Sequence, residues 1–114
     1  MKYDVVMTKE KDISFVNPYH QWIQRESFAS NLLYDKFLNW LSGEFDLYLQ
    51  DEQNGLDVFF LNGRFSVKKV AVYKENIEIE INVISKDMSI GNSIANQIMS
   101  VHNHFENMYS YSVK

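Results

Sequence analysis

Residues 54–82 read NGLDVFFLNGRFSVKKVAVYKENIEIEIN and give the strongest indication of the fold class. Apolar residues alternate with polar or charged ones along it, a period of two that is typical of half-buried β-strands. Asn54-Gly55, Asn62-Gly63 and Glu75-Asn76 interrupt the alternation. Asn-Gly is the strongest short signal for a tight hairpin turn, because type I′ turns need positive φ at both central residues. The sequence therefore predicts a four-stranded antiparallel meander over about residues 44–84.

The turns also set the expected register between strands. With a two-residue turn at residues 62–63, Val58 faces Val67. With another at residues 75–76, Val72 faces Ile79. In the strand that the two hairpins share, these registers shift the apolar positions by one residue between Val67 and Val70. We therefore expect a β-bulge at Lys68-Lys69, which would absorb the shift.

Upstream of the stretch, Phe45, Leu47 and Leu49 alternate with polar residues and predict the first strand of the meander. Gly43, just before them, is expected to stop a preceding helix. That helix is predicted over about residues 18–42, with an N-terminal Asn17-Pro18 signal. A break near Arg25 would divide it in two, with Ser27 or Ser30 restarting it. Its apolar residues recur every three or four positions, at Tyr19, Trp22, Ile23, Ala29, Leu33, Phe37, Trp40 and Leu41.

A second helix is predicted over about residues 88–108, because apolar residues again recur at helical spacing. Asp87 or Ser89 is its expected N-cap. Residues 109–113 alternate and predict a short edge strand. Two further strands are expected near the N-terminus, at residues 3–7 and 13–16. The fold class is therefore α+β, one domain over residues 1–114, with two helices on one face of the meander.

Composition excludes several function classes. The chain has 114 residues, no cysteine and a formal net charge of −4. Cysteine-based zinc sites and thiolate nucleophiles are absent, and an acidic chain is a poor direct ligand for nucleic acid. Residues 1–7 do not resemble a signal peptide, and no apolar run approaches the length of a membrane span. We expect a cytoplasmic protein that does not enter a membrane.

Chemical motifs are weak. His102 and His104 are two apart and cannot share a helix face, so an exposed polar pair of His102 with Glu106 is favoured over a metal site. Gly91-Asn92-Ser93 lies at a helix start, where phosphate can bind, but no phosphate-loop pattern surrounds it. The carboxylate pairs Glu44/Asp46 and Glu78/Glu80 are expected on the solvated side of a sheet. We expect no catalytic residues, no metal and no cofactor.

The distribution of charge carries the functional prediction. No Lys or Arg lies between Lys36 and Arg64, and that interval contains five acidic residues. Acidic groups around an apolar centre suit a surface that binds a basic protein. The alternative is that helices or the N-terminal strand cover the apolar residues, and that the charges serve solubility. The candidate partner-binding residues are Glu44, Asp46, Tyr48, Asp51, Glu52, Asp57, Phe59 and Leu61.

Two functional hypotheses follow. The first is a non-catalytic module that occludes a basic, nucleic-acid-handling protein, as an immunity protein or a phage inhibitor does. The second is a self-associating or chaperone-like domain that forms a homodimer, through exposed Phe59 and Leu61 or by edge pairing of residues 109–113. The consecutive strands depart from the usual order of small secretion chaperones.

Overall fold

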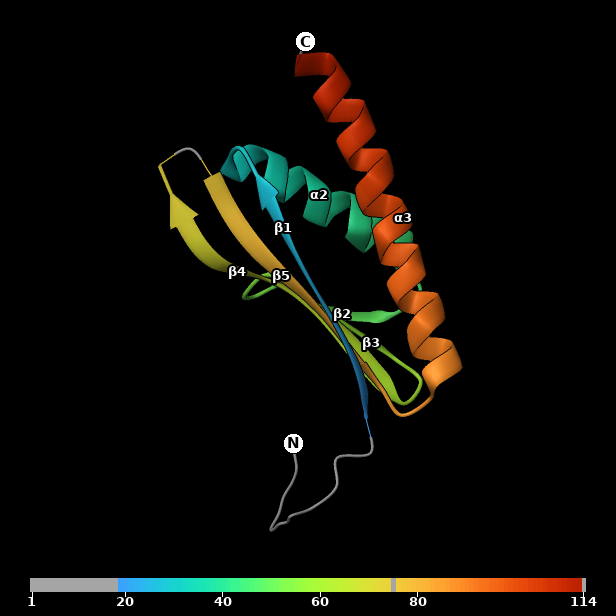
Figure 1. Cartoon of the computed structure of the whole chain (residues 1–114). Coiled ribbons are helices and arrows are strands. Elements are labelled where there is room, and N and C mark those ends of the chain that lie inside the picture. The colour runs from blue at the N-terminus through green and yellow to red at the C-terminus, as the bar shows by residue number, and fades with distance from the viewer. Residues whose placement is uncertain (1–18, 75, 114) are drawn as a thin grey trace.

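The computed structural model describes residues 19–74 and 76–113, and it shows an α+β fold (Figure 1). Both helices lie on the same side of one antiparallel sheet. The five strands are arranged in the order β1-β5-β4-β3-β2. The strands expected at residues 3–7 and 13–16 fall outside the described residues. In chain order the elements are β1 (His20–Phe28), α2 (Asn31–Glu44), β2 (Leu49–Asp51), β3 (Leu56–Phe60), β4 (Gly63–Tyr73), β5 (Asn76–Ser85) and α3 (Met88–Val113).

The predicted meander is confirmed as β2 to β5, but its hairpins are displaced by two residues. Val58 faces Phe65 rather than Val67, because Phe60 pairs with Gly63 and closes the turn. Asn62 itself takes the positive φ, 64°, as the last residue of that turn. A shift of two residues keeps every side chain on its expected face. The apolar side of the hairpin is therefore buried as the alternation predicted.

The second hairpin behaves in the same way. Val72 faces Ile77 rather than Ile79. The expected bulge is present, between Lys69 and Ala71 and so just after the predicted Lys68-Lys69. The extra residue restores the match between the two apolar sides.

The prediction of a helix beginning at residue 18 is wrong, because His20–Phe28 is strand β1. It pairs with β5 along its whole length, from His20 opposite Ser85 to Phe28 opposite Ile77. The long alternating strand β5 has two edges, and β4 occupies one of them. Pairing of β1 with the other edge outweighs the helical spacing of its few apolar residues.

The second half of the predicted helix is correct and forms α2. Its N-cap is Ser30, whose Oγ accepts a hydrogen bond from the Leu33 N–H at 3.2 Å. Gly43 does not stop the helix, which continues to Glu44 and is capped by Phe45.

Most of the strand predicted over residues 44–50 is instead a turn, and β2 has three residues. Phe45 is buried, with its ring 4.9 Å from that of Phe65, and its N–H lies 3.2 Å from the Leu41 carbonyl. The Gln50 side chain donates to the Ser42 and Phe45 carbonyls, at 3.0 and 2.6 Å. These contacts complete the end of α2, and the chain enters the sheet only at Leu49.

Helix α3 begins at the expected cap, where the Asp87 carboxylate accepts from the Ile90 N–H at 3.0 Å. It continues to Val113, so the strand predicted at residues 109–113 is wrong. The ring of Tyr109 packs 4.5 Å from that of Phe105 and 6.2 Å from that of Trp40. This aromatic contact between α2 and α3 favours continued helix.

Candidate partner-binding surface

The face of the sheet opposite the helices is uncovered by any described element. Its charges alternate in sign from strand to strand, with acidic residues on β3 and β5 and basic residues on β4 and β1. Lys68, Glu80 and Arg25 follow one another across β4, β5 and β1, and Arg25 lies 3.4 Å from Glu80. Opposite charges on neighbouring strands attract, so much of this face is internally neutralised.

The structure separates the eight predicted binding residues. Asp51, Asp57 and Phe59 lie on β2 and β3, with their side chains toward the uncovered face. Leu61 lies in the turn between β3 and β4, and its side chain is 72% exposed. The exposure of Phe59 and Leu61 leaves both available to a partner.

The other four residues lie at the end of α2 and on either side of β2. Glu44 borders a groove between α2 and α3 together with Trp40 and His104. The ring of Tyr48 packs 5.7 Å from that of Phe45, and Glu52 lies 3.4 Å from the Ser42 hydroxyl. Asp46 is exposed in the turn. Glu44 and Asp46 do not share a sheet face, because neither belongs to a strand.

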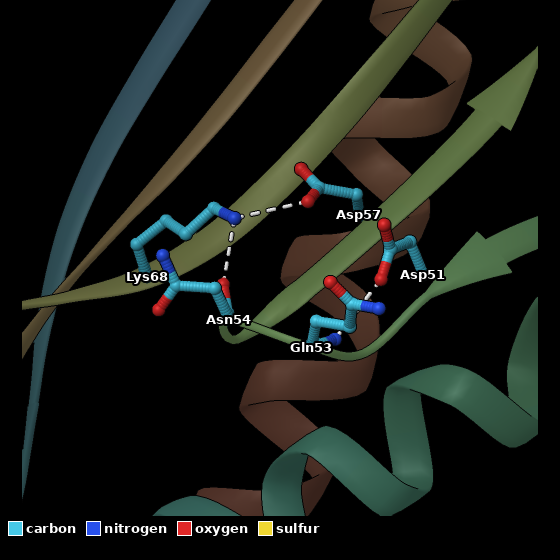
Figure 2. Close-up of polar contacts among 5 residues, drawn as sticks. All are labelled: Asp51, Gln53, Asn54, Asp57 and Lys68. Atoms are coloured by element: carbon cyan, nitrogen blue, oxygen red, sulfur yellow. Dashed lines mark hydrogen bonds and ion pairs between the residues drawn. The ribbon is translucent and has the colours of Figure 1, made fainter.

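Asp57 is not free to attract a partner. Its Oδ2 lies 2.9 Å from the Lys68 Nζ, which also donates to the Asn54 carbonyl at 2.6 Å (Figure 2). Lys68 lies outside the basic-free interval of the sequence, but the β3–β4 hairpin brings it next to Asp57. The acidic surplus of the hairpin is therefore smaller in space than along the chain.

Three of the remaining acidic residues lie on the edge strand β2 and in its two flanking turns. Asp46, Asp51 and Glu52 have no cationic group within 4 Å in the described part of the chain. The Asp51 carboxylate accepts from the Gln53 N–H at 3.0 Å, which orders the turn after β2 (Figure 2). We call the following residues the acidic edge: Asp46, Leu47, Leu49, Asp51 and Glu52.

Leu47 and Leu49 were missed as candidates, because their alternation with acidic residues predicted a buried strand face. In the structure Leu47 is 96% exposed and Leu49 is 75% exposed. Phe45 enters the core as the cap of α2, the turn that follows exposes Leu47, and β2 places Leu49 opposite Phe59 on the uncovered face. Their proximity to the acidic residues was visible in the sequence, but their exposure was not.

The expected exposed pair of His102 with Glu106 is wrong. His102 is buried, and its ring lies 6.0 Å from Phe28 and 5.6 Å from Phe37. Its Nε2 is 3.5 Å from the Glu26 carboxylate of β1. His102 lies on the inward side of α3, whereas Glu106 is exposed.

Gly91 serves close packing at the start of α3. A Cβ at this residue would lie 2.4 Å from the Trp22 ring, whose Nε1 donates to the Asn92 side chain at 3.0 Å. Among the described residues there is no group of three or more His, Cys, Asp or Glu side chains arranged to hold a metal ion.

Neither helix, within the described residues, has an apolar stretch long enough to cross a bilayer. No family model matches the sequence. No curated protein matches it either.

Proposed function

We propose that this chain is a non-catalytic protein-binding module whose acidic edge receives a basic surface of another protein. The observation that carries the proposal is that one edge of the sheet combines exposed leucines with carboxylates that have no cationic partner among the described residues. Leu47 and Leu49 offer apolar contact area, and their neighbours Asp46, Asp51 and Glu52 have no cationic group within 4 Å among the described residues. Apolar contact supplies affinity, while the charges steer a basic partner toward the edge.

A nucleic-acid-handling enzyme fits this requirement, because such an enzyme carries a basic surface for phosphate. The module would then act as an inhibitor, of the immunity or anti-defence type, by covering that surface. Phe59 and Leu61 lie on the neighbouring strand and turn, and they extend the apolar part of the contact.

The test is capture from a lysate of the source cells, with three forms of the tagged chain. These are the unmodified chain, the charge swap Asp46→Lys/Glu52→Lys, and the control swap Asp35→Lys/Glu106→Lys. Both swaps change the net charge equally and alter exposed residues. We expect a basic nucleic-acid enzyme to be retained by the unmodified chain and by the control swap, and to be lost with the acidic-edge swap.

The purified pair then gives a direct measurement. Affinity should fall steeply as salt is raised, and the chain should inhibit the captured enzyme. A partner that binds the acidic-edge swap as tightly as the unmodified chain would refute the proposal.

A further inference from the structure

The second edge of the sheet has different properties from the acidic edge. Strand β1 forms this edge, and β5 pairs with it residue for residue over nine residues. No described strand lies on its other side. Every second residue of β1 therefore presents outward an N–H and a C=O that no described strand pairs.

Exposed strand edges are normally protected against pairing with another chain. The usual devices are short length, lysine, proline or a bulge. Strand β2 has three residues flanked by carboxylates, but β1 is long, unbulged in its pairing with β5, and free of lysine and proline. Its one arginine, Arg25, is paired with Glu80.

One antiparallel register pairs β1 with a second copy of itself over its whole length and opposes no like charges. Facing residues of an antiparallel pair must point to the same side of the sheet. The twofold axis therefore lies midway between the two strands, level with one residue that faces its own copy, and below we name the axis by that residue. An axis through Arg25 or Glu26 would oppose like charges. An axis through Gln24 pairs all nine residues, with Ile23 opposite Arg25 of the partner subunit and Trp22 opposite Glu26 of the partner subunit.

We propose that two copies of this chain pair through β1 in that register and form a continuous ten-stranded sheet. The twofold axis is perpendicular to the sheet, so the helices of both copies lie on one side. The two acidic edges stay free at the far ends of the joined sheet. The dimer does not depend on the proposed function, because it uses the opposite edge.

The test substitutes Gln24 in the full chain, because this residue faces its own copy at the proposed twofold axis. Gln24→Lys places two ammonium groups opposite each other, and Gln24→Glu places two carboxylates there. Like charges facing each other oppose pairing. The Gln24 side chain is exposed and donates to the neighbouring Glu26 carboxylate at 2.7 Å, so both substitutions change this surface contact but open no cavity in the core. We expect the unmodified chain to sediment as a dimer and each variant to dissociate about tenfold more readily.

An equimolar mixture of the two variants should restore the dimer, because opposite charges then face each other. Gln53→Lys and Gln53→Glu, in the exposed turn between β2 and β3, are the matched controls and should leave dimerisation unchanged. Circular dichroism identifies a misfolded variant. Recovery of the dimer on mixing the two variants shows that residue 24 of one copy faces residue 24 of the other.

Three outcomes would overturn the proposal. One is a monomer throughout a concentration series. Another is a dimer whose dissociation is unaffected by either Gln24 variant. The third is a monomer whose outward β1 amides are protected from hydrogen exchange, which would assign the edge to the chain's own residues 1–18. Each result is independent of whether a basic protein binds the acidic edge.

Discussion

Glu26 of β1 and His102 of α3 meet between the sheet and the helix, with Oε1 and Nε2 3.5 Å apart. The imidazole is buried between Phe28 and Phe37, and neither ring nitrogen has a hydrogen-bond partner among the described residues. Buried polar groups without partners reduce stability. This contact therefore joins two elements at a cost in desolvation.

We predict that His102→Leu leaves the free energy of unfolding unchanged or raises it by about 1 kcal/mol, since leucine fills the site without unsatisfied nitrogens. His102→Ala should lower it by about 2–4 kcal/mol, because it opens a cavity. Urea denaturation measures both. A loss of more than about 1 kcal/mol in His102→Leu would show that the imidazole contributes favourable polar contacts.

Gly91 and Gly43 should respond oppositely to alanine. Gly91→Ala brings a Cβ against Trp22 at 2.4 Å, and we expect a loss of about 1–3 kcal/mol from overpacking. Gly43→Ala meets no atom within 4 Å and lies in α2, so it should stabilise by about 0.5–1 kcal/mol. The two melting curves, measured side by side, should shift in opposite directions. A gain in stability at Gly91 would contradict the packing against Trp22.

The ion pair of Lys68 with Asp57 is partly exposed, and its contribution is correspondingly small. We predict that Asp57→Asn lowers the free energy of unfolding by about 0.5–1 kcal/mol. The loss should shrink at high salt, because screening already weakens the pair in the unmodified chain. Asp46→Asn is the control, with no cation within 4 Å in the described residues, and should change stability by less than about 0.5 kcal/mol. Equal effects of the two substitutions would contradict the pairing.

Tyr34 provides a prediction at alkaline pH. Burial, and then the neighbouring charge of Asp35, raise the pKa of Tyr34 above its ordinary value of 10.0. The folded chain holds this proton more tightly than the unfolded chain. Its contribution to stability is therefore complete below pH 10 and is lost as the pH rises through the folded-state pKa.

We expect Tyr34→Phe to remove a late-ionising component from the ultraviolet titration of the tyrosines, and to flatten the fall of stability above pH 10. Tyr48→Phe, at an exposed ring, is the control and should leave the late-ionising component in place. A late-ionising component that persists in Tyr34→Phe would contradict its assignment to this buried residue.

Local signals predicted the elements whose structure depends on local interactions. The alternation in residues 54–82 predicted the meander, since the period of two places one face in the core. The capping residues Ser30 and Asp87 were among those expected, because a cap needs only a side-chain oxygen near the first free N–H groups. Although both turns are displaced, each side chain points to its predicted side of the sheet, because both shifts are of two residues.

The candidate site was predicted in part, and the errors came from contacts between residues distant in sequence. The acidic interval was visible along the chain, but the register of β3 with β4 brings Lys68 to Asp57. Phe45 leaves the predicted strand to cap α2 against Phe65, which exposes Leu47 and Leu49. The residues adjacent to Asp57 and Phe45 in the sequence do not identify Lys68 and Phe65 as their partners.

The α+β class, the consecutive antiparallel strands and the acidic interval between Lys36 and Arg64 follow from periodicity and composition, which can be recognised without knowledge of any contact. The strand His20–Phe28 depends on a distant partner, because the free edge of β5 supplies the backbone hydrogen bonds that outweigh its helical spacing. The same pairing places β1 and β2 at opposite edges of the sheet, and so separates the acidic edge from the edge proposed to join two copies.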